Sequence, residues 1–465
     1  MEFKIQKINI SEIEECYLAR VKYILTEIGF RGGIKFIVSE EESSIIYSPN
    51  HKNDQQINSM RFNYEFYDLK TQSNLLNRID FKKPKNCLFN EDLIGFCFYQ
   101  LMLGEEKQIS SYYKFKDGNF LTKNLPSFKK EYASKAVVDQ ISILISNFLG
   151  HTNNSHNYLP PNKSFSLCLT HDVDKLNYIN FNEILLNLSK TIYRKDTNYL
   201  KETINAIRNR NDYDIFLKWL NLKKEFNIKS CFYLSNRSTS PLTINDVKSR
   251  LDNSKVSLKN IKKLNEMGHE FGFHPPINAK NNFKEFAFSK KRIQDKLEFP
   301  IHGIRHHYWS LDWEKPYLTY RKHENAGFKY DTSMAWKDIP GFRSGTCLPY
   351  RTFDLERNRQ LEHYVLPTGI MDSHIIPIKI NLNENDKENI ESNFLKILQE
   401  VKKYNGSLVI DCHAELIARK FYRKDEIKTI LDLIKKYINT SETWVTTPWE
   451  LIKFYHQNRK FFEVK

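Results

Sequence analysis

The chain has 465 residues, 40% of them hydrophobic and 14% aromatic, a length that favours two domains over one. Its net charge of +15 comes largely from lysines spread along helical segments, which is typical of solvated faces and argues against a dedicated nucleic-acid surface. No apolar stretch reaches the ~20 residues that a membrane-spanning helix needs, and the first residues lack a secretion signal, so we expect no membrane span and a cytoplasmic location.

The first 150 residues combine helical stretches with short β-rich runs and contain no pattern that indicates catalysis. They predict a small α/β domain at 1–150 that ends in an amphipathic helix at 135–149. The polar, proline-bearing run at 151–164 has the composition of a linker. We therefore expect the second domain to occupy 165–465.

After the linker, short apolar runs alternate with amphipathic helices, a pattern typical of a parallel α/β sheet or barrel. Seven strands are expected, at 165–170, 230–234, 270–274, 303–305, 330–333, 407–412 and 443–446. Five helices are expected between them, at 214–226, 257–267, 283–297, 388–404 and 424–438. Residues 177–212 are additional to this alternation and predict a helical surface insertion.

Asp172 and Asp174 follow directly on the first of these strands, in the run Ser-Leu-Cys-Leu-Thr-His-Asp-Val-Asp. In an extended chain, side chains two residues apart point the same way. Active sites of parallel α/β folds lie at the carboxyl ends of the strands. Paired carboxylates repel each other unless a cation lies between them or one acts as a base. A helix cap or an Asx turn is the alternative interpretation of these two residues alone.

Three further strand ends carry side chains that suit metal or acid–base chemistry. One strand ends in the run Gly-His-Glu-Phe-Gly-Phe-His, another in Gly-Ile-Arg-His-His-Tyr-Trp, and a late one in Leu-Val-Ile-Asp-Cys-His. Neutral imidazole is a good ligand for a divalent metal, although most lone histidines bind none. The position at a shared sheet edge is therefore what makes candidates of His274, Arg305, His306, His307 and His413.

Together these motifs resemble the polysaccharide deacetylase family, which contains chitin, peptidoglycan and nodulation-factor deacetylases. Thr-His-Asp-Val-Asp is similar to a variant of its first motif, Gly-His-Glu-Phe-Gly-Phe-His to its second, and the arginine of Arg-His-His-Tyr to that of its third. The resemblance spans roughly 165–455. It implies a distorted, seven-stranded (β/α) barrel of the NodB-homology type. The pattern of Thr-His-Asp-Val-Asp, Phe-His-Pro, Arg-x-His-Tyr and Gly-Phe-Arg-Ser-Gly-Thr is most similar to that of a bacterial subgroup with an additional N-terminal domain, which is associated with surface-polysaccharide gene clusters.

The resemblance also implies a reaction: hydrolytic removal of an acetyl group from an N- or O-acetylated sugar with a divalent metal, most often zinc. By motif position it implies Asp172 as the general base, with Asp174 and His274 as metal ligands. Arg305 is implied as the residue that orients the base, and His413 as the general acid. The expected partner is an acetylated oligo- or polysaccharide of the bacterial surface, or its precursor.

One position departs from the family pattern. The second histidine of the family's second motif is expected four residues after His274, where this chain has Asn278. An amide oxygen binds zinc less well than imidazole does, so the third ligand remains open among Asn278, His306 and His307. The departure supports an alternative hypothesis, a catalytically degenerate deacetylase-like protein that binds carbohydrate. A metal-free glycoside hydrolase with two carboxylates is a further alternative.

Five more residues are candidates for the substrate cleft: His171, Tyr308, Trp309, Arg343 and Asp372. The run Gly-Phe-Arg-Ser-Gly-Thr at 341–346 lacks the Lys-Ser/Thr ending of a phosphate loop, so we expect a cleft or barrel-rim loop there. Asp372 lies in Met-Asp-Ser-His, for which a surface turn is an equal interpretation.

Overall fold

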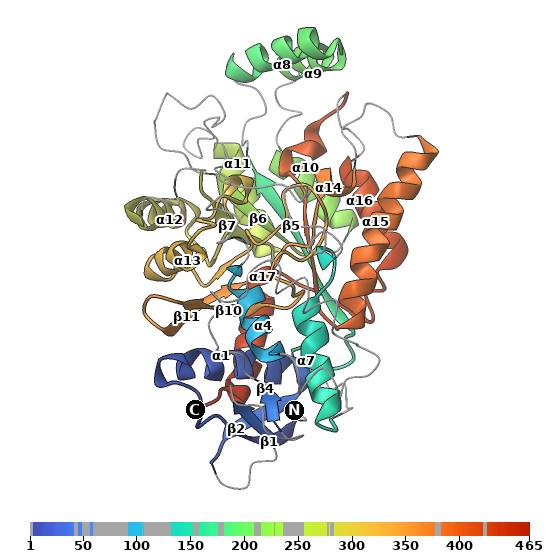
Figure 1. The fold of residues 1–465 in the computed structure, drawn as a ribbon. Coiled ribbons are helices and arrows are strands. Elements are labelled where there is room, and N and C mark those ends of the chain that lie inside the picture. Colours follow the sequence, from blue (N-terminus) through green and yellow to red (C-terminus); the bar gives the residue numbers. More distant parts are fainter. Residues whose placement is uncertain are drawn as a thin grey trace.

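The protein is a mixed α/β structure with two sheets (Figure 1). The computed structural model describes residues 3–40, 45–48, 56–58, 92–104, 106, 132–151, 158–174, 181–208, 215–226, 228–235, 255–276, 279, 283–376, 383–421 and 426–465. None of the helices in these ranges combines the length and apolarity that would let it cross a membrane.

The N-terminal sheet has four parallel strands in the order β2-β1-β3-β4. Its strands are β1 (Lys4–Asn9), β2 (Ile34–Val38), β3 (Ile45–Ser48) and β4 (Gln56–Asn58). The helices of this part are α1 (Glu15–Gly32), α4 (Leu93–Leu101) and α7 (Val137–Phe148). Helix α1 stops where Gly33 adopts a left-handed conformation with φ of 70°, and its N–H donates to the carbonyl of Gly29. This glycine cap turns the chain directly into β2.

Within the described residues, the large sheet contains ten strands, and every pair in it is parallel except β10 with β11. The seven expected strands all form: β5 (Phe165–Val173), β6 (Ser230–Ser235), β7 (Glu270–His274), β8 (Gly303–Ile304), β9 (Tyr330–Asp331), β13 (Ser407–Asp411) and β14 (Thr443–Val445). Neighbours along the sheet run β10-β11-β9-β8-β7-β6-β5-β13-β12, and β14 pairs with β5. Figure 1 shows this sheet between two groups of helices.

The expected count of seven strands is wrong because three further strands form, two that mix charged with apolar residues and one that is only two residues long. These are β10 (Tyr350–Asp354), β11 (Arg359–Val365) and β12 (Ile370–Met371). Strand β10 carries Arg351, Thr352 and Asp354, and all three side chains are buried. The Nε of Arg351 donates to the carbonyl of Leu361 at 2.8 Å, so this strand satisfies its polar groups inside the protein.

The five expected helices of the second part also form, as α10 (Ile215–Glu225), α11 (Lys255–Glu266), α12 (Phe283–Leu297), α15 (Glu384–Lys403) and α16 (Glu426–Tyr437). The expected insertion is confirmed as a helix pair, α8 (Phe181–Arg194) and α9 (Asn198–Arg208), at the top of Figure 1. Helices α13 (Pro316–Asn325) and α17 (Pro448–Arg459) were not expected, and each begins with a proline at its first position. Short helical segments are η6 (His307–Trp309), α14 (Asp372–Ile375), η7 (Ala414–Ala418) and η8 (Lys460–Phe462).

One apolar core joins the N-terminal part to the large sheet. It includes Ile24 of α1, Phe98 of α4 and Ile141 of α7 together with Trp336 and Phe353. Because this core draws residues from both sides of 151–164, the division into domains at 1–150 and 165–465 stays a prediction.

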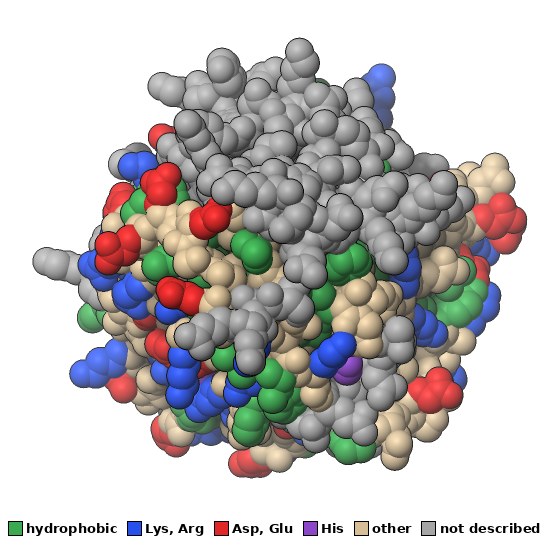
Figure 2. Space-filling model, turned by 60° about the horizontal axis from the view of Figure 1, so that its bottom comes forward, with side chains coloured by type: hydrophobic (Ala, Val, Ile, Leu, Met, Phe, Trp, Pro, Cys, Tyr) green, Lys and Arg blue, Asp and Glu red, His purple; other side chains and the backbone are tan. Residues whose placement is uncertain are grey.

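On the face in Figure 2, basic and acidic side chains are interspersed.

A buried ionic network also links the two parts. The carboxylate of Glu27 in α1 pairs with Arg31 at 2.6 Å and with Arg459 of α17 at 2.7 Å. Arg31 pairs in turn with Asp139 of α7 at 2.9 Å. Burial disfavours the charged form of Glu27, but the two guanidinium groups outweigh it and hold its pKa below the usual range. Two cations and two anions therefore compensate one another out of contact with water.

We predict that Glu27→Ala lowers the free energy of unfolding by about 3–5 kcal/mol, because it leaves two buried guanidinium groups without their shared anion. Denaturant unfolding at neutral pH measures this loss. The control is Lys262→Ala, which breaks an exposed pair with Glu298 at 2.6 Å and is expected to cost no more than about 1 kcal/mol. Equal losses in the two variants would contradict a stabilising role for the network.

Candidate active site

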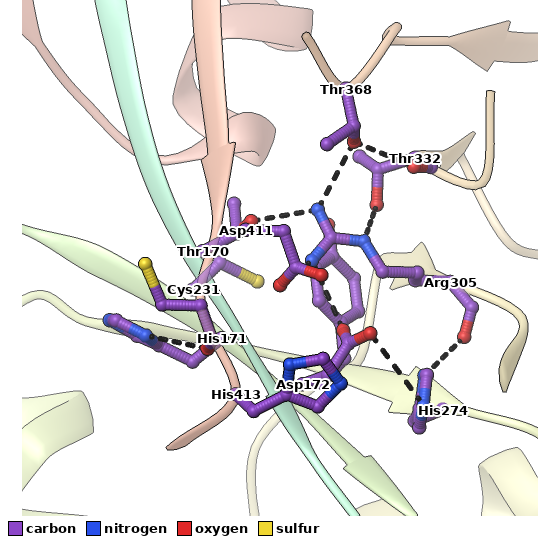
Figure 3. A network of polar contacts seen from close by, with 12 residues as sticks. Thr170, His171, Asp172, Cys231, His274, Arg305, Thr332, Thr368, Asp411 and His413 are labelled. Carbon is purple, nitrogen blue, oxygen red and sulfur yellow. Dashed lines mark hydrogen bonds and ion pairs between the residues drawn. The ribbon is translucent and has the colours of Figure 1, made fainter. Parts of the chain in front are cut away.

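The expected strand ends meet at one edge of the large sheet. Strand β5 is buried along its whole length and pairs in parallel with β13 on one side and β6 on the other. Strand β7 pairs with β6, and β8 with β7, also in parallel. The carboxyl ends of β13, β5, β7 and β8 therefore lie close together, and the side chains that follow them face one another (Figure 3).

Asp174, His274 and His307 form a cluster in which one potential ligand atom of each lies within 4.8 Å of the others. The Nε2 atoms of His274 and His307 are 3.1 and 3.6 Å from Oδ1 of Asp174. Two nitrogens and a carboxylate oxygen are a donor set that zinc prefers. This cluster contains both ligands expected from the motifs and one of the three candidates for the third.

The tautomer of His274 indicates that a cation fits this cluster. Its Nδ1 lies 2.7 Å from the carbonyl oxygen of Arg305, and because a carbonyl only accepts, Nδ1 carries the proton. In the neutral ring, the buried Nε2 presents a lone pair to the carboxylate of Asp174 at 3.1 Å. Two lone pairs 3.1 Å apart are stable when a cation lies between them. The residues present therefore fit a divalent metal ion.

A strained turn places His307 in this cluster. Tyr308 and Trp309 both have left-handed backbone conformations, with φ of 56° and 55°. Such conformations cost non-glycine residues of order 1–3 kcal/mol each and persist where the surroundings impose them. The N–H of His307 donates to the carbonyl of Pro275 at 3.1 Å, which fixes the start of the turn beside β7. The ring of His307 thereby returns toward Asp174.

The other two candidates for the third ligand do not join the described cluster. His306 is buried and points away from it, with its Nε2 2.8 Å from the Nε2 of His323. Asn278 lies outside the described residues.

Arg305 lies next to the cluster, and its side chain is fully buried. Its Nη1 contacts Oδ1 of Asp172 at 3.1 Å and Oδ1 of Asp411 at 2.7 Å. Its remaining donors reach threonine hydroxyls at 2.7–3.3 Å, on Thr170, Thr332 and Thr368. Burial raises the pKa of Asp411 well above its usual range, and the nearby guanidinium of Arg305 offsets only part of this rise. Asp411 and Asp172 therefore share one guanidinium, which makes its shorter contact with Asp411.

On the opposite side of the cluster, His413 is held by Asp372. Oδ2 of Asp372 accepts from the backbone N–H of His413 at 2.8 Å and lies 2.9 Å from its Nδ1. Burial disfavours the imidazolium, but the buried carboxylate of Asp372 outweighs it and raises the pKa of His413 well above its usual range. The Nε2 of His413, 3.9 Å from Oδ2 of Asp174, is therefore a proton donor that faces the cluster.

Asp372 was expected either to line the cleft or to lie in a surface turn, and both interpretations are wrong. Its side chain is fully buried behind His413. The parallel pairing of β12 with β13, in which Met371 lies opposite Asp411, brings it there. No local sequence signal predicts this contact, because the two partners are 41 residues apart.

Two further cleft candidates belong to the interior. His171 is fully buried, its Nδ1 lies 3.2 Å from the carbonyl of Cys412, and its ring packs against Trp219 and Phe232. It lies next to Asp172 along an extended strand, so its side chain points to the opposite face of the sheet. Packing, and not contact with a substrate, accounts for this histidine.

Arg343 is likewise fully buried, which corrects the expectation of a cleft or rim loop at 341–346. Its Nε pairs with Glu106 at 3.0 Å. Its guanidinium lies 3.4 Å from the ring centroid of Trp313 and 5.2 Å from that of Trp336. The loop packs against the N-terminal part of the chain, whose contribution the local sequence does not reveal.

The last two candidates adjoin the cluster. The side chain of Tyr308 is 43% exposed, and its ring centroid is 4.3 Å from that of His307. Tyr308 therefore remains a candidate for substrate contact. Trp309 is buried, with its ring 5.5 Å from the guanidinium of Arg305, so it supports the site from within.

We predict that His307→Ala lowers the zinc affinity of the solvent-facing centre by about 100-fold or more, because it removes one of three donors. Isothermal titration of zinc into chelator-treated protein measures the affinity. Asn278→Ala is the matched variant and is expected to bind zinc like the wild type. The reverse result, with tight binding in His307→Ala and weak binding in Asn278→Ala, would assign the third ligand to Asn278.

No protein-family model matches the chain, and no curated protein matches it either. Among solved structures, a Puue allantoinase is 14% identical, with 66% of this chain and 95% of that chain covered at a TM-score of 0.42. A probable polysaccharide deacetylase from Pseudomonas aeruginosa PAO1 is 13% identical, with coverages of 66% and 96% and a TM-score of 0.42. A polysaccharide deacetylase from Bacillus cereus is 13% identical, with coverages of 61% and 91% and a TM-score of 0.29. Likenesses at this level carry no conclusion about the activity of this chain.

Proposed function

We propose that the protein is a metal-dependent hydrolase that removes acetyl groups from an N- or O-acetylated sugar of a bacterial surface polysaccharide or its precursor. The observation that supports this most is the cluster of Asp174, His274 and His307 beside a buried Asp172–Arg305 pair. The sugar substrate rests on the resemblance of the sequence motifs. Two imidazoles and one carboxylate make zinc the preferred ion.

Asp174, His274 and His307 would hold the ion, which when bound polarises a carbonyl and lowers the pKa of water. Asp172 is the proposed general base. Its Oδ1 is held by Arg305 at 3.1 Å, while Oδ2 lies 3.7 Å from Nε2 of His274, on the side of the ligand set. The free lone pair of Oδ2 is thus directed to where an attacking water would lose its proton.

His413 is the proposed general acid. Its Nε2–H faces the ligand set, and the carboxylate of Asp372 stabilises the imidazolium. Arg305 contacts Asp172 and Asp372 contacts His413. The proposed base and the proposed acid are therefore held by different side chains. One removes a proton from water, and the other gives a proton to the leaving nitrogen or oxygen of the sugar.

Two observations favour this proposal over its alternatives. The hypothesis of a catalytically degenerate binding protein rests on the absence of a histidine at position 278. His307 is the proposed third donor in its place. A metal-free glycoside hydrolase needs a carboxylic acid that reaches the glycosidic oxygen. Asp411, whose pKa is raised by burial, lies fully buried against Arg305 and does not reach the surface of the site.

Acetate release from a panel of acetylated oligosaccharides tests the proposed function. Asp172→Asn is expected to lower kcat by about 10²-fold or more, because it removes the base. Chelation is expected to abolish release, and added zinc to restore it. Asp432→Asn, an exposed aspartate on α16, is the control and should match the wild type. Equal release by wild type and Asp172→Asn after complete chelation would overturn the mechanism.

We further predict that Asp372→Asn moves the alkaline limb of the pH–rate profile to lower pH. The reaction needs protonated His413, so the rate falls as pH rises through the pKa of this imidazole. Burial lowers that pKa and the carboxylate of Asp372 raises it, so removal of the carboxylate leaves the lowering effect. The profile of kcat/KM against pH measures the shift. An unmoved alkaline limb in Asp372→Asn would exclude His413 as the acid.

A further inference from the structure

A second cluster of metal-binding side chains lies behind the turn that carries His307. It contains His306, which follows β8, His323 of α13 and Asp331 of β9. One potential ligand atom of each lies within 4.8 Å of the others, and all three side chains are fully buried. We propose that these three residues hold a second, structural divalent cation, with zinc favoured by the donor set.

The two imidazoles approach as ligands of one ion do. Their Nε2 atoms are 2.8 Å apart, and Nδ1 of His323 is 3.8 Å from Oδ2 of Asp331. Two nitrogens at the usual 2.0–2.1 Å from a tetrahedral zinc are about 3.3 Å apart. If these two Nε2 atoms moved apart by about half an ångström, both could bind one zinc ion.

Unsatisfied nitrogens in the same region indicate a missing partner. Both ring nitrogens of His363 are buried without a hydrogen bond to any described residue. A buried polar group without a partner costs about 1–3 kcal/mol. The ring centroid of His363 is 5.2 Å from that of His323. Structural zinc sites have four ligands, and His363, which lies outside the three-residue cluster, would have to move toward the ion to serve as the fourth.

The charge of Asp331 points the same way. Its carboxylate accepts from the N–H and the Oγ of Ser333 at 2.7 and 2.8 Å. Within the described ranges, no lysine or arginine forms an ion pair with it. The charge of Arg305 acts on Asp331 only from beyond ion-pair distance, and a divalent ion would add positive charge in direct contact with the carboxylate.

The surroundings are those of a closed site. The ring of Phe286 contacts His306 and His323 edge-on, with centroids 5.5 and 5.3 Å away. Tyr320 and Phe328 lie on other sides of His323, with centroids 5.9 and 6.3 Å away. An apolar shell excludes water from the ligands. We therefore expect the ion to be acquired during folding and to exchange slowly afterwards.

The position of the cluster gives the ion a structural purpose. His306 lies between Arg305 and His307 in the chain, and its N–H donates to Oγ of Ser333 at 2.8 Å. An ion at this point would tie the end of β8 to β9 and α13. It would thereby hold the segment that presents Arg305 below the candidate active site and His307 within it.

Metal content tests this proposal apart from the proposed function. The variant Asp174→Ala/His307→Ala removes the solvent-facing centre, and after native dialysis against chelator we expect it to retain one zinc per chain. Adding His323→Gln to this variant should lower the content to zero. No zinc in the double variant, or equal zinc in the double and triple variants, would overturn the proposal. Failure of the proposed function leaves both expectations unchanged.

A second measurement covers the case in which His323→Gln prevents folding. The double variant Asp174→Ala/His307→Ala, refolded with cobalt, should show the visible absorption of a tetrahedral ion with nitrogen ligands, and the band should remain after native dialysis against chelator. His363→Gln in the same background should change the band, because it replaces the candidate fourth ligand. A refolded double variant without this absorption would overturn the site.

Discussion

The candidate active site depends on the buried guanidinium of Arg305. It contacts Asp172 of β5 and Asp411 of β13, and its other donors reach threonines that follow neighbouring strands. A charge in this position needs compensation, and a single guanidinium can compensate only one of two carboxylates in full. Burial raises the pKa of Asp411, which opposes a negative charge at that carboxyl group. The proposed base, Asp172, is held by a buried interaction that a substrate does not touch.

Burial also separates the roles within the site. The side chains of Arg305 and Asp172 are 0% and 7% exposed, whereas those of Asp174 and His413 are 21% and 25% exposed. The buried layer fixes charge and orientation, and the outer layer presents ligand and proton-donor atoms to solvent. A site of this kind keeps its geometry without a substrate, because its supporting contacts are made inside the protein.

The sequence predicts the elements that local pattern determines. Apolar runs such as 165–170 become strands, and parallel pairing brings Asp172, Asp174 and His274 together as expected. Strand β10 was missed because three of its five buried residues are polar or charged. The contact of Asp372 with His413 depends on the register of β12 against β13, which no local pattern encodes. The choice of His307 over His306 depends on two left-handed residues that carry no glycine signature.

The different directions of the His306 and His307 side chains connect the two proposed metal sites. His306 and His307 are adjacent, yet one ring faces the buried cluster and the other faces Asp174. A left-handed turn at Tyr308 and Trp309 is strained, and strain of this kind relaxes unless neighbouring contacts oppose it. In the proposed arrangement an ion bound by His306, His323 and Asp331 supplies that opposition. In the same arrangement the third donor of the active-site cluster comes from a turn after β8, and such a turn needs the rigidity that a buried ion provides.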